Sequence, residues 1–298
     1  MEAADALASA PKRSAGRRLA DLFHGRRWLQ VSGLLSGPLA WLVIGYIGSL
    51  IVLLVAAFWS VSALTGEVSQ VWSLDNFKTL VEDSVYRTIA WRTVRIAALV
   101  TITDAVLAFP IAFYMAKVAS RRTRAALVVG ILMPLWSFYL VKVYAWRTML
   151  SADGVINWAL EPLGLHGPGY GTTAVWLVMS YLWLPYMILP IYAGLERIPD
   201  SLLSASEDLG ASPFTTFRRV ILPLSFPAMV AGSIFTFSLT LGDYITPQLV
   251  SNSQFIGNVV SSNITNNLPL ASAFAVVPIV VMVIYLLIAR RLGAFEHL

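Results

Sequence analysis

Charged side chains occur inside stretches of this chain that are otherwise apolar. Asp104 and Asp243 are carboxylates in two such stretches, and Lys142 is a cation in a third. An ionised side chain in a membrane is costly, so each must face water, a partner or the interior of a helix bundle. At about 1.5 Å per helical residue, Asp243 and Lys142 lie at similar depths. We expect an Asp243–Lys142 ion pair, a helix end kept polar by its flanking residues, or a carboxylate that contacts a ligand. For Asp104 the structural and ligand roles are equally open.

Aromatic side chains beside prolines are a second group that could contact a ligand. The set comprises Trp136 and Tyr139 near Pro134, and Trp183 and Tyr186 near Pro185. Proline interrupts the hydrogen bonding of a helix, and interrupted membrane helices border cavities in many transporters. These rings either line such a cavity or pack against neighbouring helices.

The chain lacks the motifs of nucleotide-binding and hydrolytic sites. It contains no Gly-x-x-x-x-Gly-Lys-Ser/Thr loop, no His-Glu-x-x-His and no Gly-x-Ser-x-Gly. Its histidines, His24, His166 and His297, are scattered, and it has no cysteine, which excludes disulfides and thiolate metal sites. We therefore expect no catalytic residue, no metal and no cofactor in this chain.

The composition indicates a membrane protein. Of the 298 residues, 57% are hydrophobic and 12% are charged, and the mean hydropathy is +0.72. A soluble domain has about 25% charged residues, and a membrane-spanning helix needs about 20 apolar residues. Six runs fit, at about Pro38–Trp59, Ile96–Met115, Ala125–Ala145, Ala174–Ala193, Phe226–Leu241 and Ala271–Ala289. We predict an all-α, polytopic membrane fold with about six spans, divided into a basic N-terminal tail at residues 1–35 and a membrane domain at residues 36–298.

The basic residues predict the orientation of these spans. With both termini in the cytoplasm, 15 of the 21 Lys and Arg residues lie on the inner side, which is the side that such residues favour. Six lie on the outer side or near outer helix ends: Lys78, Arg87, Arg92, Arg95, Lys142 and Arg147. Topology thus accounts for the net charge of +5, and we expect membrane lipid, not nucleic acid, around the chain.

The inner loop at about residues 195–223 is the most informative segment. Asp200 predicts a helix start at which its carboxylate caps free N–H groups, and Gly210 predicts a left-handed helix end. Ser212 before a proline predicts a second helix, with Pro223 closing the unit. The sequence therefore indicates a helix, a tight turn and a second helix.

Apolar side chains of this loop share helix faces at intervals of three and four residues. The faces comprise Leu202, Ser206 and Leu209 on the first helix, and Phe214, Phe217 and Ile221 on the second. They either pack on the undersides of the chain's own spans or insert into a groove of a cytosolic partner.

This loop resembles the coupling loop of the membrane subunits of type I ABC importers, which carries Glu-Ala-Ala, then Gly, then Ile-x-Leu-Pro. The spacing is kept, with Ala205, Gly210, Leu222 and Pro223 identical, whereas Ser204 stands at the acidic position and Ser206 at the second Ala. The resemblance covers about residues 92–291. It implies contact with an ATPase through Ser204, Ala205, Ser206, Glu207, Leu209, Gly210, Phe214 and Pro223. Glu207, one turn further along, could replace the missing glutamate only from a neighbouring position.

A narrower resemblance concerns the solute. The segments YLVKVYAWRTMLSADGVIN, TLGDYITPQLV, FIGNVVSSNI and LPLASAFA are similar to permeases of spermidine and putrescine importers. This implies that Asp243 and Tyr244 line the path of a cationic solute, since carboxylates and aromatic faces attract amines. The same type of importer for an opine, an amino-acid derivative, a phosphonate or an iron chelate is the alternative, and a membrane sensor that moves no solute is another.

The resemblance also implies partners. We expect a cytosolic ABC ATPase dimer that binds ATP and Mg²⁺, a second and distinct permease subunit, and an extracytoplasmic solute-binding protein. The expected location is the bacterial inner membrane, and the expected mechanism is alternating access, in which the pathway opens to one side at a time.

Overall fold

The computed structural model describes residues 27–62 and 66–291, and the predicted tail up to residue 26 lies outside them. Residues 1–55 and 56–298 form two compact units, which are described separately. Residues Val31–Ala56 form one long apolar helical stretch that could cross a membrane. Pro38, at which the sequence predicted this span to begin, lies inside the helix. Its parts are α3 (Arg27–Trp41), a π-helical stretch (Leu42–Ile47) and α4 (Gly48–Ala56).

The second unit begins with a short hairpin and two helices. In the hairpin, Ser60 pairs with Ser69 and Val61 with Val68. Helix α6 starts at Ser84, where the Asp83 carboxylate accepts a hydrogen bond from the backbone N–H of Val85 (2.8 Å). The helix therefore starts well before Ile96, where the sequence predicted the second span to begin. The elements are β1 (Ser60–Val61), β2 (Val68–Ser69), α5 (Asp75–Glu82) and α6 (Ser84–Phe113), which continues into a π-helical turn (Tyr114–Val118).

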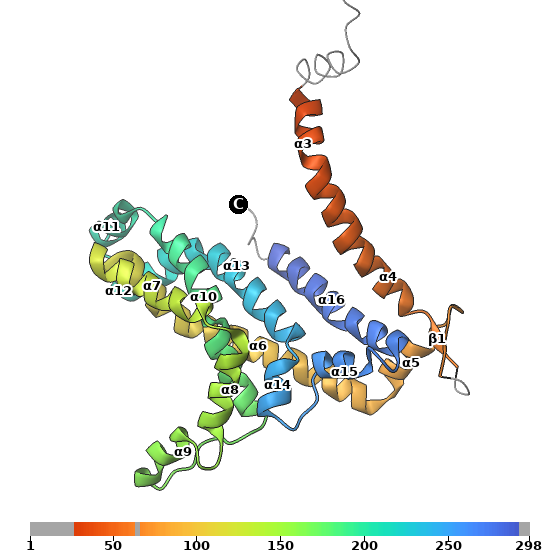
Figure 1. The fold of residues 1–298 in the computed structure, drawn as a ribbon. Helices are drawn as coiled ribbons and strands as arrows, with labels where there is room; N and C mark the ends of the chain where they lie inside the picture. Colours follow the sequence, from red (N-terminus) through yellow and green to blue (C-terminus); the bar gives the residue numbers. More distant parts are fainter. Residues whose placement is uncertain (1–26, 63–65, 292–298) are drawn as a thin grey trace, which may run out of the picture. The chain divides into compact units, whose positions relative to one another are not determined.

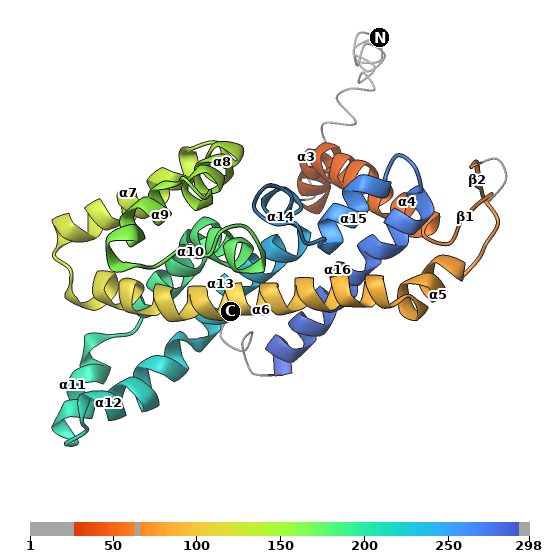
Figure 2. The same cartoon turned by 90° about the horizontal axis from the view of Figure 1, so that it is seen from below.

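Three long helices, α6, α10 (Thr172–Glu196) and α13 (Leu222–Gly242), pack on one another as the centre of this unit (Figures 1 and 2). Small residues allow the close approach, as is usual for membrane helices. A Cβ atom on Gly194 of α10 would lie 2.4 Å from the Cβ of Ala228 on α13, and one on Gly232 would lie 2.9 Å from the Met187 sulfur. The interface therefore requires glycine at both positions.

Shorter helices surround this centre. Helix α16 packs on α13, α15 and α5, and α8 packs on α14. The remaining elements are α7 (Arg121–Trp136), α8 (Tyr139–Leu150), α9 (Val155–Leu160), a 3-10 turn (Glu161–Leu163), α11 (Asp200–Asp208), α12 (Pro213–Thr216), a π-helical turn (Phe217–Ile221), α14 (Ile245–Val250), α15 (Ile256–Asn263) and α16 (Leu268–Arg291).

The predicted third span is not one straight helix. It is divided into α7 and α8, which meet at an angle of 91°. The Pro134 carbonyl oxygen accepts hydrogen bonds from the Ser137 N–H (3.3 Å), the Ser137 hydroxyl (2.9 Å) and the Lys142 ammonium (3.1 Å). These bonds satisfy a backbone group that the break leaves without a helical partner.

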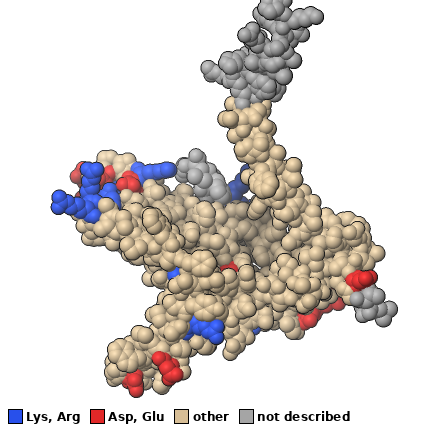
Figure 3. Space-filling model, in the orientation of Figure 1, with Lys and Arg blue, Asp and Glu red and all other residues tan. Residues whose placement is uncertain are grey.

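The described chain thus holds five helices long and apolar enough to cross a membrane, or six with the bent pair. On the face drawn in Figure 3, charged side chains gather near α11 and α12, near α8 and α9, and near β1 and α5, while most of the surface between these places is uncharged. This distribution fits an apolar middle in lipid and charged ends in water. The predicted all-α fold with about six spans is confirmed.

Candidate functional site

Asp243 lies at the end of α13 and is the centre of a hydrogen-bonded cluster. Its Oδ1 accepts from the backbone N–H groups of Ile245 (2.9 Å) and Thr246 (3.3 Å). Its Oδ2 accepts from the hydroxyls of Tyr139 (2.5 Å) and Thr246 (2.6 Å). All four donors are uncharged, so the negative charge of the carboxylate is not neutralised by these partners.

Two predicted aromatic residues flank this carboxylate cluster. The ring of Tyr139 is stacked on that of Trp183, with centroids 6.0 Å apart and planes at 11°, and Trp183 meets Tyr186 at 6.0 Å and 60°. The indole N–H of Trp183 is buried and has no hydrogen-bond partner within the residues described. The structure therefore brings Asp243, Tyr139, Trp183 and Tyr186 together from α13, α8 and α10, and it leaves a donor free among them.

The predicted ion pair between Asp243 and Lys142 is wrong. Lys142 and Asp243 are both described, and they form no ion pair, because the Lys142 ammonium bonds to the Pro134 carbonyl instead. The depth argument assumed a straight third span, and the 91° bend removes that assumption. The helix end after Asp243 is indeed polar, as the second alternative proposed, but through the N–H groups and hydroxyl that Asp243 binds.

Three other predicted path residues lie apart from the cluster or at its surface. Trp136 is 91% exposed at the end of α7, and Tyr244 is 41% exposed beside Asp243. Asp104, on α6, is fully buried next to Ser180 of α10, and neither of its carboxylate oxygens makes a hydrogen bond within the described chain. Asp104 therefore faces the bundle interior and not lipid, as expected for an intramembrane carboxylate.

The predicted helix, turn and helix are present at the other end of α13. We call α11 and α12, with the turn between them, the coupling hairpin (residues 200–216). Gly210 has φ +76°, and the N–H groups of Gly210 and Ala211 donate to the carbonyls of Glu207 (2.8 Å) and Ser206 (3.0 Å). This is the double bond pattern of a Schellman helix end, which favours glycine at the left-handed position. The Ser212 side chain caps α12 through the N–H of Thr215 (3.3 Å).

Two details of the coupling hairpin differ from the prediction. Asp200 does not cap α11 but binds the Lys117 ammonium (2.8 Å), and this hydrogen-bonded cation lowers the pKa of the Asp200 carboxyl below its usual range. Pro223 does not close the unit, because α12 continues through the π-helical turn into α13 as one helix from Pro213 to Gly242. Pro223 therefore lies inside this continuous helix, two residues after the π-helical turn at Phe217–Ile221, where the regular α-helical hydrogen bonding is already interrupted.

The apolar side chains of the coupling hairpin and of the π-helical turn that follows it divide into two groups. Phe217 packs edge-on against Phe109 of α6 at 5.4 Å, and Ile221 is buried, so these two pack within the chain. Leu209 at the tip is 89% exposed and Phe214 is 70% exposed. Ser204, Ala205, Glu207 and Pro223 are also exposed, so this surface is accessible to a partner.

Sequence reasoning missed two threonines that organise these sites. Thr246 holds both Asp243 and Tyr139 (2.7 Å), and an Asp followed three residues later by Thr is a usual signal of such a local turn. Thr216 is buried and its hydroxyl lies 2.8 Å from that of Ser206, which ties α11 to α12. Ser206, which stands where the family motif has its second Ala, is therefore hydrogen-bonded across the two helices. No local sequence signal indicates this bond.

Among the described residues, no group of three or more His, Asp or Glu side chains is placed to hold a metal.

Comparisons with known proteins identify the family. The model of the binding-protein-dependent transport system inner membrane component matches residues 91–295. The inner membrane ABC transporter permease protein YdcU of Escherichia coli K12 is 44% identical over 306 residues, which cover 97% of each chain. The spermidine/putrescine transport system permease protein PotB of Salmonella typhimurium LT2 is 31% identical over 75% of this chain and 80% of its own length.

Solved structures agree on the fold. A bacterial ABC transporter involved in alginate import aligns with a TM-score of 0.69 at 19% identity, over 92% of this chain and 99% of that chain. An alginate transporter in complex with its pentasaccharide-bound periplasmic protein gives 0.71 at 18% identity, over 93% and 97%. Because the family model matches residues 91–295, more than half of the chain, and a permease relative is 44% identical over 97% of it, the chain belongs to the binding-protein-dependent inner membrane permeases of ABC importers.

Proposed function

We propose that this permease subunit carries a polyamine such as spermidine or putrescine. The observation on which the proposal depends is the Asp243 carboxylate, held by uncharged donors beside the stacked rings of Tyr139 and Trp183. A protonated amine is attracted both by an unneutralised carboxylate and by the faces of aromatic rings. The PotB relatives, whose names specify spermidine and putrescine, support this choice at 29% and 31% identity.

The same type of importer for another small solute is the competing proposal. The relative at 44% identity has a name that specifies no solute, and the solved relatives are alginate transporters. An acidic polysaccharide would be repelled by Asp243, whereas an opine or an amino-acid derivative carries an amine that Asp243 would attract. The polyamine proposal and the competing proposal therefore differ in how many positively charged groups the solute carries.

The coupling hairpin supports proposals about partners. Its exposed Leu209 and Phe214 fit a groove of a cytosolic ATPase dimer, which would bind ATP and Mg²⁺, while this chain would supply no catalytic residue. A second, distinct permease would complete the pathway, and a solute-binding protein would deliver solute at the opposite side, as the complex of the alginate transporter suggests by analogy. The hairpin, and with it both termini, would lie in the cytoplasm.

The decisive experiment is solute-stimulated ATPase activity of the complete transporter in proteoliposomes. The binding protein is presented with putrescine, spermidine, an opine, an alginate oligosaccharide or a neutral amino-acid derivative. We expect stimulation by the polyamines, and Asp243→Asn should lower uptake about tenfold or more, because hydrogen bonds to charged groups are worth about 1.5 to 3 kcal/mol.

Glu82→Gln is the matched control, because Glu82 is an exposed carboxylate in α5 that lies outside the cluster. Asp243→Glu keeps the charge and should restore part of the uptake if charge is the cause. Stimulation by a neutral or anionic solute alone would discard the polyamine proposal and keep the importer. Equal uptake by wild type and Asp243→Asn would remove Asp243 from the pathway.

A further inference from the structure

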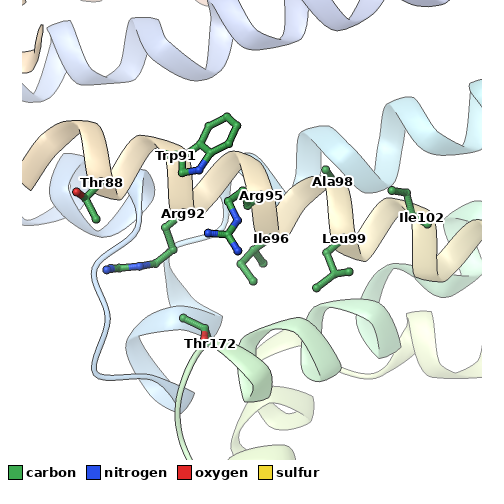
Figure 4. Close-up of a pocket in the computed structure, with 9 residues that line it drawn as sticks. All are labelled: Thr88, Trp91, Arg92, Arg95, Ile96, Ala98, Leu99, Ile102 and Thr172. Atoms are coloured by element: carbon green, nitrogen blue, oxygen red, sulfur yellow. The ribbon is translucent and has the colours of Figure 1, made fainter.

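A groove on α6 lies at the end of the helix farther from the coupling hairpin. It has a volume of about 610 Å³ and runs along α6 to the start of α10, where Thr172 forms its wall. Arg92 and Arg95 lie at one end of it, and Ile96, Leu99 and Ile102 continue it along the helix (Figure 4). We call this feature the arginine groove.

The arginine groove changes from basic to apolar where the membrane should begin. The apolar run of α6 starts at Ile96 and continues to Met115, which at about 20 residues matches the hydrocarbon core. Arg92 and Arg95 therefore lie at the level of the lipid headgroups, and Trp91, which is 64% exposed, has the usual position of an interfacial tryptophan. The three apolar residues lie deeper, at the level of the acyl chains.

The positive charge in the arginine groove is not neutralised within the described part of the chain. The Arg92 guanidinium donates to the backbone carbonyl of Gln254 (2.9 Å), and neither Arg92 nor Arg95 forms an ion pair there. The two arginines are one helical turn apart, and like charges at this spacing repel. An anion between them would relieve the repulsion, whereas a cationic solute would increase it.

We propose that the arginine groove binds a phospholipid with an anionic headgroup. Its phosphate lies between Arg92 and Arg95, and one acyl chain follows Ile96, Leu99 and Ile102. The apolar part of the groove, from Ile96 to Ile102, is about 9 Å long along the helix, which lies within the hydrocarbon depth of one leaflet, about 15 Å. The site lies in the leaflet on the side opposite the coupling hairpin and does not depend on which solute is carried.

Native mass spectrometry of the full-length chain, titrated with phosphatidylglycerol in detergent, tests this site. Arg95→Gln should weaken phosphatidylglycerol binding about fivefold, the amount expected for one basic residue at an anionic membrane surface. Arg95→Lys should retain binding, and Leu99→Trp should weaken it by filling the apolar part. Arg147→Gln is the control, since Arg147 is an exposed arginine at the end of α8 outside the groove.

Location can be tested separately because the chain has no cysteine. A single Leu99→Cys carrying a photoreactive label, in vesicles of phosphatidylethanolamine and phosphatidylglycerol, should cross-link to phosphatidylglycerol. Equal affinity of wild type and Arg95→Gln, equal affinity for phosphatidylcholine, or an equal loss in Arg147→Gln would each overturn the proposal. A cross-link to a second permease subunit in place of lipid would also overturn it, because a protein interface would then fill the groove.

Discussion

Tyr139 contributes a hydroxyl and a ring to different contacts. The hydroxyl joins α8 to Asp243 and Thr246, while the ring is stacked on Trp183. Replacing tyrosine with phenylalanine separates the two, because the ring stays and the hydrogen bonds are lost. The contribution of the hydroxyl can thus be measured without removing the aromatic surface.

We expect Tyr139→Phe to lower the free energy of unfolding by about 1 to 3 kcal/mol, because it removes one hydrogen-bond partner of a partly buried carboxylate. Thermal unfolding in detergent measures this, with Tyr144→Phe, an exposed tyrosine on the same helix, as the control. Uptake should fall less than in Asp243→Asn. If unfolding and uptake both equal those of wild type, the Tyr139 hydroxyl does not hold the cluster.

At the residue scale, sequence reasoning found the right side chains but paired some of them wrongly. Asp243 and Tyr139 were both singled out, yet the one side-chain partner considered for Asp243 was Lys142, as one of three alternatives, and Tyr139 was not considered. A residue count that assumes straight spans cannot reveal the bend between α7 and α8. In addition, hydroxyl groups near Asp243 compete with the more distant Lys142 ammonium for the carboxylate. Asp104 was expected to face the bundle interior, water or a partner, and the structure shows the first of these, because its side chain is fully buried.

The Lys142 side chain stabilises the bend between α7 and α8. Its substitution should therefore change how these two helices are held relative to one another. Lys142→Met removes one of the donors to the Pro134 carbonyl and keeps an unbranched side chain of similar length. We expect greater mobility of α8 relative to α7 and uptake reduced about fivefold, as for the loss of one hydrogen bond of about 1 kcal/mol.

Distances between spin labels on single-cysteine pairs in α7 and α8 measure this mobility directly. Lys142→Arg keeps a cationic donor and should behave as wild type. An unchanged distance distribution in Lys142→Met would show that the two Ser137 bonds alone hold the bend.

Gly194 determines how closely α10 approaches α13. A Cβ there would lie 2.4 Å from that of Ala228, so Gly194→Val must push the helices apart. We expect a loss of about 1 to 3 kcal/mol, the usual cost of overpacking, measured by thermal unfolding. Gly130→Val is the control, because no atom lies within 4 Å of a Cβ at that position on α7. Similar losses in both variants would point to helix propensity and not to the interface.

At the element scale, the sequence predicted the number and type of the spans better than their breaks. Apolar length identified every span, and glycine and serine signals placed the turn and the start of α12 in the coupling hairpin. Apolarity is the same on both sides of Ser137, so it could not reveal the division of the third span. Pro223 was predicted to end the second helix. The π-helical turn before it, which accommodates the proline ring, does not change the hydrophobic periodicity, so the sequence pattern could not indicate that the helix continues.

Leu209 and Leu74 are a matched pair for testing the contact with the ATPase. Both leucines are exposed, by 89% and 58%, but Leu209 is at the tip of the coupling hairpin, whereas Leu74 precedes α5 at the other end of α6. We expect Leu209→Ala to weaken ATPase binding about tenfold or more, as for a side chain anchored in a partner's pocket, and Leu74→Ala to leave it unchanged.

Binding of the purified ATPase to the reconstituted permease measures this difference. A single Phe214→Cys should also form a specific cross-link to the ATPase in a chain that has no other cysteine. Equal binding of the two leucine variants, without a cross-link, would assign the coupling hairpin to another contact.

At the scale of the whole molecule, the sequence predicted an orientation of the spans but not their lateral surfaces. Lys and Arg side chains do gather near α11 and α12 on the face drawn in Figure 3, while the orientation of the termini stays a prediction. The arginine groove was not foreseen, because Arg92 and Arg95 were placed outside the second span, which was predicted to start at Ile96. Only the helical start of α6 places both beside an apolar face.

The uninterrupted helix from Pro213 to Gly242 has a mechanical consequence. It is about 45 Å long, with Phe214 near one end and Asp243 directly after the other. A rigid rod of this length that pivots by about 5° near its middle displaces each end by about 2 Å, which is enough to break the hydrogen bond that the Tyr139 hydroxyl of α8 donates to Asp243. A displacement of the coupling hairpin would thus move the Asp243 carboxylate at the other end of the helix. Bending at the π-helical turn would reduce the size of this movement.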